Sequence, residues 1–362
     1  MRCFGATNAA RSTRSGARFT RVWLSLTIVL CACQPTGLVV ERCRADRECP
    51  TFAPFCACDG LCRASASDRP DAGANDAGVP SPLTVVVARV RTFPTNGGGF
   101  GVDLDERIDA PAGSCLDQPD LVSALDGDPG VDNQFIEVAG GIDYVVGGDG
   151  WDGALAHTVI AGAEVLALEV TADDASGCRR HVHAWTARIE AGPVARDIDC
   201  AAAPVQTVCD AVNGGACFWP STGGCFGIRG GQTWRAIDDL GEVDSRTIAG
   251  RLRTAPFAHV PLLPTIAPRG GTPVLAPLDM QGVVLEADVG EETLLRGELG
   301  GVIAMSDLEP WGNTHVLGPA AAFDDAMYRS LFAPDLAPDA EGVCQEISAG
   351  FGFETVSAIL LH

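Results

Sequence analysis

The chain has 362 residues, 46% of them hydrophobic and 20% charged, so it is too apolar to be disordered throughout and long enough for about two domains. Its 47 acidic residues outnumber 25 basic ones, and the resulting formal charge of −22 disfavours nucleic acid as a partner. All 25 basic residues are arginine, which excludes a Schiff-base lysine and the lysine of a phosphate-binding P-loop.

The first 33 residues have the pattern of an export signal. Residues 1–32 contain five arginines and no acidic residue, and they include the apolar run 22–30. A run of this length is too short to cross a bilayer as a helix, which needs about 20 residues, but it is typical of a signal peptide. It ends in Leu30-Cys31-Ala32-Cys33, which resembles the lipobox of bacterial lipoproteins.

This resemblance implies that residues 1–32 are a lipoprotein signal peptide and that Cys33 is lipidated, so that acyl chains hold the protein on a membrane. Gln34 follows the cysteine, and under the enterobacterial sorting rule this implies the outer membrane, with the protein periplasmic or surface-facing. The alternatives are an ordinary secretory signal and an uncleaved anchor.

Residues 33–62 predict a small disulfide-rich module. The segment is too poor in apolar residues to form a core, and an exported protein meets an oxidising environment, so its cysteines favour a disulfide framework over a metal site. The pattern is similar to the Cys-rich modules that follow the anchor in many bacterial surface lipoproteins. The cysteines are Cys43, Cys49, Cys56, Cys58 and Cys62.

Residues 63–82 and 83–362 differ sharply in composition. The first range is mostly Ala, Gly, Pro, Ser and Asp, and it predicts a flexible linker. The second range predicts a β-rich globular body, because short apolar or alternating runs recur between clusters of Gly, Pro, Asn and Asp. Strand and helix patterns do not alternate along the sequence, so a parallel sheet is not expected. We therefore expect a mainly β, antiparallel, sandwich-like body with two or three helices.

The helices of the body are expected in three places. The residues of 319–332 have apolar side chains at helical spacing, with Pro319 near the start and Arg329 in the last turn. Weaker patterns cover 120–125 and 131–139. In the strand expected at 347–353, the apolar side chains share one face opposite Ser and Gly, which predicts one buried side.

The body contains seven more candidates for disulfide bonds, four of them between residues 200 and 225. We expect these four to pair with one another or with Cys178. One of them, Cys225, lies in Gly223-Gly224-Cys225-Phe226-Gly227, which has the spacing of a nucleophile elbow with cysteine in place of serine, but a disulfide is the preferred interpretation. The seven are Cys115, Cys178, Cys200, Cys209, Cys217, Cys225 and Cys344.

Two clusters of residues are candidate metal sites. Asp126, Asp128, Asp132 and Glu137 have the spacing of oxygen ligands in a calcium loop, and Asp149 and Asp152 follow. The alternative is a solvated acidic turn. The second cluster is His181 and His183, which alternation along a strand places on one face, as in zinc and copper sites. The alternative is a pair of surface or packed histidines.

The sequence thus predicts an exported, lipid-anchored envelope or surface protein with a non-enzymatic binding or structural role. Its ligand would be an envelope polysaccharide, a peptide or another envelope protein. The alternative is an extracellular metal-assisted hydrolase that acts through the region Asp126 to Glu137. Calcium is the cofactor that the acidic loop suggests.

Overall fold

The structure is a computed structural model, and it divides the chain into one unit of residues 1–40 and another of residues 41–362. All described residues lie in the second unit. They are 55–56, 61–63, 82–94, 98–104, 121–125, 127, 129–146, 150–161, 164–173, 178–190, 195–198, 217–218, 225–228, 230–266, 274–289, 294–317, 323–332 and 334–362. The lipobox and Cys33 lie outside them, as does nearly all of the predicted linker.

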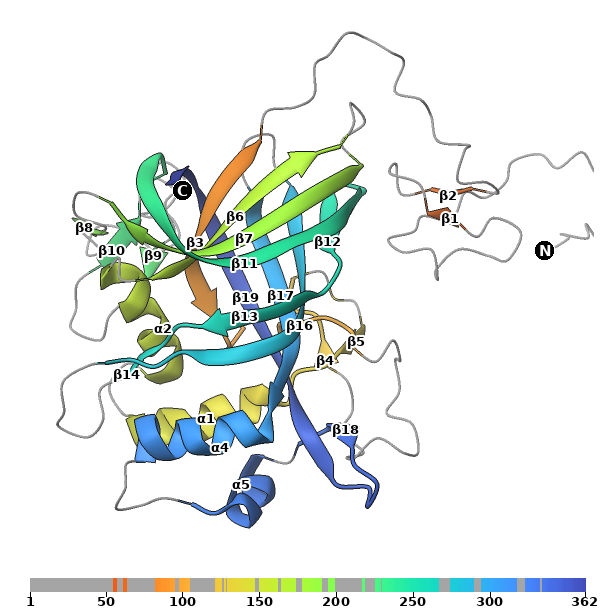
Figure 1. The fold of residues 1–362 in the computed structure, drawn as a ribbon, viewed down its shortest axis with the longest axis vertical. Helices are drawn as coiled ribbons and strands as arrows, with labels where there is room; N and C mark the ends of the chain where they lie inside the picture. Colours follow the sequence, from red (N-terminus) through yellow and green to blue (C-terminus); the bar gives the residue numbers. More distant parts are fainter. Residues whose placement is uncertain are drawn as a thin grey trace, which may run out of the picture. The chain divides into compact units, whose positions relative to one another are not determined.

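A large antiparallel sheet dominates the body, as the sequence predicts (Figure 1). Its strand order is β12-β11-β7-β6-β3-β19-β17-β16-β13, with β18 paired to β19. The strands are β3 (Leu83–Arg91), β6 (Val165–Ala172), β7 (Arg179–Ile189), β11 (Gln232–Ile248), β12 (Arg251–Thr254), β13 (Phe257–Leu262), β16 (Leu278–Val289), β17 (Leu294–Ala304), β18 (Leu336–Pro338) and β19 (Cys344–Leu361).

The sheet closes on itself, because β12 pairs with β16 as well as with β11. The opposed layers of the body are therefore parts of one continuous sheet. Within the described strands, the one parallel pairing joins the start of β11 to the end of β19. Four small sheets complete the β structure of the described residues: β1 (Phe55–Cys56) with β2 (Cys62–Arg63), β4 (Leu121–Val122) with β5 (Pro129–Val131), β14 (Thr265–Ile266) with β15 (Val274–Leu275), and β8 (Ala195–Ile198), β10 (Cys225–Ile228) and β9 (Cys217–Phe218) together.

The described helices are α1 (Phe135–Val146), α2 (Gly150–Ala161), α4 (Met305–Trp311), α5 (Asp325–Phe332) and the π-helical turn η2 (Gly312–Leu317). In Figure 1, α1, α4 and α5 gather near one end of the large sheet. The helix expected over 319–332 is confirmed from Asp325 onward, and Asp324 caps it by accepting a hydrogen bond from the Met327 N–H (2.9 Å).

Two helix expectations need correction. Residues 121–122 form β4 rather than a helix, because they pair with β5. The helix expected over 131–139 begins only at Phe135, since Val131 belongs to β5.

The aromatic rings of the helices enter the core: Phe135 packs against Trp151 and Phe351, with ring centroids 5.5 and 5.6 Å apart.

The face of β19 that carries Ser and Gly is also buried, contrary to expectation. The segment 98–104 lies directly on this face, and we call it the strap. Glycine permits the close approach, because a Cβ at Gly350 would overlap the Phe100 carbonyl and one at Gly352 would lie 2.6 Å from the Phe100 ring. The buried Asn133 amide donates to the carbonyls of Phe100 (2.8 Å) and Gly350 (3.0 Å), so it holds strap and strand together.

Candidate functional site

The acidic residues predicted to bind calcium are only partly described. Asp126 and Asp128 lie outside the described residues, so the calcium loop stays a prediction. Asp132 accepts a hydrogen bond from the Leu104 N–H (2.7 Å), and Asp152 accepts one from the Thr92 N–H (2.8 Å). Within the part of the chain that the structure describes, no three His, Cys, Asp or Glu side chains are arranged to hold a metal ion.

Glu137 lies in the first turn of α1 and lines an apolar cavity of about 210 Å³. Aromatic rings form much of its wall: Trp311 of α4, Tyr328 of α5, and Phe323, which precedes α5. Burial raises the pKa of Tyr328 to about 12, because the phenolate would lose its hydration there. These surroundings offer a cation few oxygen ligands beyond Glu137 itself.

His181 and His183 share the outer face of β7, as alternation predicts, and both are held by carboxylates. The His181 Nε2 lies 2.7 Å from Asp173, and its Nδ1 lies 3.1 Å from Asp244 on β11. The His183 Nε2 lies 2.8 Å from Asp239, and its ring stacks on Trp185 at 3.7 Å. Both histidines therefore position acidic side chains of this surface.

The carboxyl group of Asp239 titrates lower than usual as a result. A hydrogen bond to His183 is the largest cause of its lowered pKa, and a hydrogen bond from the Gly241 N–H adds to the effect. Both bonds favour the ionised carboxylate.

The strand register also brings three arginines together next to His181. Arg179 on β7 is directly opposite Arg246 on β11, and Arg246 is directly opposite Arg253 on β12. Cross-strand partners point to the same face of a sheet, with Cβ atoms about 5 Å apart. We call Arg179, Arg246 and Arg253 the arginine row.

The row borders a cavity of about 440 Å³, which we call the row cavity. Small-molecule sites measure roughly 300–1,000 Å³, so the row cavity has the size of a binding site. Four arginines and two aspartates line it, which gives these residues a formal charge of +2 in a chain of charge −22. The lining residues are Asp173, Arg179, Arg180, Asp244, Ser245, Arg246, Ile248, Arg253, Thr254 and Ala255.

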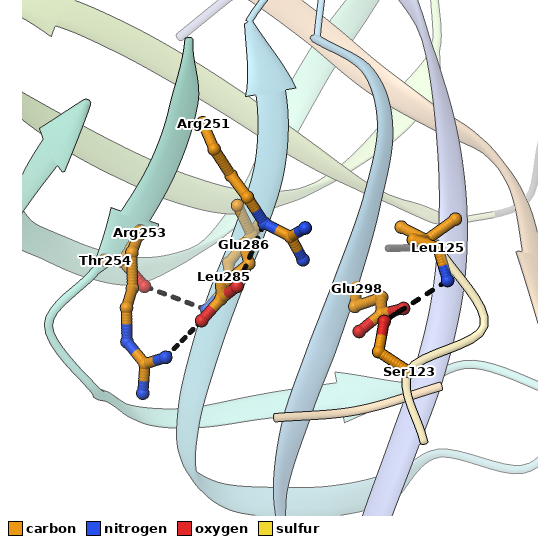
Figure 2. A network of polar contacts seen from close by, with 8 residues as sticks. All are labelled: Ser123, Leu125, Arg251, Arg253, Thr254, Leu285, Glu286 and Glu298. Carbon is orange, nitrogen blue, oxygen red and sulfur yellow. Dashed lines mark hydrogen bonds and ion pairs between the residues drawn. The ribbon is translucent and has the colours of Figure 1, made fainter. Parts of the chain in front are cut away.

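The protein neutralises one end of the row. Glu286 on β16 forms ion pairs with Arg253 and with the Nε of Arg251 (3.0 Å), and Figure 2 shows it between these two arginines. The carboxylate is well buried, with 16% of its side chain exposed. At the other end, Arg179 and Arg246 are exposed neighbours, and like charges at directly opposed positions repel.

The carboxylates of the row cavity add hydrogen-bond acceptors. Asp173 and Asp244 line it, and the His181 ring lies between them. Burial lowers the pKa of Arg180, which means that its cation is partly removed from water. The cavity therefore offers guanidinium donors for an anion and carboxylate acceptors for hydroxyl groups.

Local sequence patterns did not predict this cavity. Arg179-Arg180 and Arg251-Leu252-Arg253 were visible signals, but their meaning depends on the register of β7, β11 and β12. No local pattern gives that register, because the residues lie up to 74 positions apart.

The predicted disulfide cysteines are described in part. Cys62 of the predicted module and Cys178 and Cys344 of the body are disulfide-bonded. Cys225 is the first residue of β10, so a strand begins at the cysteine, whereas a nucleophile elbow requires a helix after the nucleophile. Cys115, Cys200 and Cys209 lie outside the described residues, and the predicted pairing around 200–225 stays a prediction.

Comparison with known protein families, curated proteins and solved structures found no match. Among the described residues, no helix has both the length and the apolarity needed to cross a membrane.

Proposed function

We propose that this chain is an exported, lipid-anchored envelope protein whose β body binds an acidic saccharide in the row cavity. The observation that carries the proposal is the arginine row, because its cross-strand register concentrates positive charge beside a cavity of binding-site size, which favours an anionic ligand there. Guanidinium groups match the geometry of carboxylate and sulfate groups, and Asp173 and Asp244 can accept hydrogen bonds from sugar hydroxyls.

The resemblance to a lipobox at Cys33 and the linker 63–82 support the proposal that the protein acts in the cell envelope. A lipid anchor followed by a flexible segment would present the body away from the membrane surface, where envelope polysaccharide is within reach. The non-enzymatic role remains our proposal, and a metal-assisted hydrolase would need the ligands at Asp126 and Asp128.

Calorimetric titration of the full-length chain in detergent tests the proposal. We expect a trisaccharide of galacturonic acid to bind and the neutral maltotriose not to bind. Arg179→Gln should weaken binding about tenfold, the size expected for one charge-assisted hydrogen bond. Because it also relieves repulsion from Arg246, this variant should unfold at the same or a higher temperature than the parent chain.

Arg188→Gln is the matched control, since Arg188 is an exposed arginine of the same strand and does not line the row cavity. Its affinity should equal that of the parent chain. Equal binding of both trisaccharides, or an affinity untouched by Arg179→Gln, would refute the proposal.

A further inference from the structure

A second group of arginines lies on different strands of the sheet. In the register, Glu354 on β19 is directly opposite Arg89 on β3 and directly opposite Arg296 on β17. Arg91 lies two residues beyond Arg89, on the same face of β3. Three arginines therefore share one face of three adjacent strands with the carboxylate of Glu354.

These residues line a cavity of about 200 Å³, which we call the strap cavity. The Phe100 ring of the strap forms one wall, and Ala124 and Leu125 form another. Ser123 holds that second wall in place, because its hydroxyl donates to the buried Glu298 (3.0 Å) and accepts from the Leu125 N–H (3.2 Å), as Figure 2 shows. Hydrogen bonds therefore fix the position of this wall of the cavity.

The carboxylate of Glu354 cannot satisfy all three cations. Its Oε1 is shared by Arg91 (3.3 Å) and Arg89 (3.8 Å), which are only 23% and 21% exposed. The Nε of Arg91 is buried and has no hydrogen-bond acceptor among the described residues. The lining carries three arginines against one glutamate, a formal charge of +2.

Burial makes this concentration of charge costly. The pKa of Arg89 is lowered to about 10, first by removal from water and then by the neighbouring charge of Arg91. Both effects would be offset by an anion in the strap cavity, because it would supply opposite charge and hydrogen-bond acceptors at once.

We propose that the strap cavity binds one dianionic oxyanion group, a phosphate or a sulfate, between Arg89, Arg91 and Arg296. Its volume is below the roughly 300 Å³ at which small-molecule sites begin, so it suits a single group rather than a whole saccharide. The charge of +2 matches a dianion. The site is independent of the row cavity and of the function proposed there.

Calorimetric titration of the full-length chain with inorganic phosphate and with sulfate, at constant ionic strength, tests this proposal. Arg296→Gln should weaken binding of both anions about tenfold. Glu354→Gln should instead strengthen it, since this change removes the carboxylate that competes with the anion for Arg89 and Arg91. A variant that merely damaged the fold would lower affinity in both cases.

Arg188→Gln again serves as the control and should bind as the parent chain does, since it lies outside the cavity. Glucose 6-phosphate extends the test: binding as tight as that of inorganic phosphate assigns the site to a phosphoryl group on a larger ligand, and weaker binding assigns it to the free ion. No binding of either anion at 10 mM (a hundred times a Kd of about 10⁻⁴ M), or equal binding by the parent and Arg296→Gln, would overturn the proposal.

Discussion

The contact between His183 and Asp239 has a measurable consequence for titration. Replacing His183 with Ala removes the largest cause of the lowered Asp239 pKa, so that pKa should rise toward its ordinary value. The rise should be partial, because the Gly241 N–H still donates to the carboxylate. Carbon-detected NMR titration of the Asp side chains measures it.

His181→Ala is the control for this prediction, since His181 contacts Asp173 and Asp244 rather than Asp239. Because the folded pKa of Asp239 is lowered, its hydrogen bonds stabilise the fold above the unfolded pKa, and this stabilisation is lost as the pH falls through the folded value. A pKa of Asp239 that is the same in His183→Ala and the parent chain would contradict the assignment.

The close approach of the strap to β19 depends on glycine. Gly350→Ala should destabilise the fold by about 1–3 kcal/mol, the usual cost of overpacking, because the new methyl group meets the Phe100 backbone. Gly140→Ala is a matched change in α1, where a Cβ has nothing within 4 Å. It should be neutral or stabilise by up to about 1 kcal/mol, since alanine favours helix.

Chemical denaturation of both variants measures the two free energies of unfolding. If Gly350→Ala were as stable as the parent chain, the strap would not lie on β19 as described.

Elements with strong local patterns were predictable from the sequence. The apolar run of β3, the alternation of β7 and the helical spacing of α5 all predict structures that are present. Residues 121–122 were predicted wrongly, because their pairing with β5 overrides a weak helical pattern. The second buried face of β19 could not be predicted, since segments far away in the sequence cover it, among them the strap, more than 240 residues away, and Gln134, whose N–H donates to Ser348.

The two candidate sites show the same limit. The shared face of His181 and His183 follows from local alternation along β7. The two groups of arginines could be predicted only from the register between strands. That register depends on long-range packing and turn geometry. The acidic loop was the most visible local pattern, yet its described members Asp132 and Glu137 face a strap N–H and an apolar cavity.

The lipid anchor predicted at Cys33 can be tested on the full-length chain. We expect the mature chain to begin at a lipidated Cys33, and mass spectrometry of its N-terminal peptide measures this. Cys33→Ala removes the sulfur that would accept the lipid, so the signal peptide should stay uncleaved and the chain should carry no lipid, whereas Cys31→Ala should be processed normally. A mature N-terminus without lipid downstream of residue 33 would exclude the anchor.

The pairing of β3 with β19 has a consequence for how the chain reaches its folded state. Arg91 and Glu354, which meet across this pair, are 263 residues apart in the sequence. Contacts that close such long loops lose much chain entropy before they return any stabilisation, and they slow folding. Because the chain is synthesised from its N-terminus, one edge of β3 stays unpaired until β19 has been made. Until β19 pairs with it, the unpaired edge of this apolar strand can bind extended segments of other chains. We therefore expect the unfolded chain to aggregate unless another molecule covers that edge.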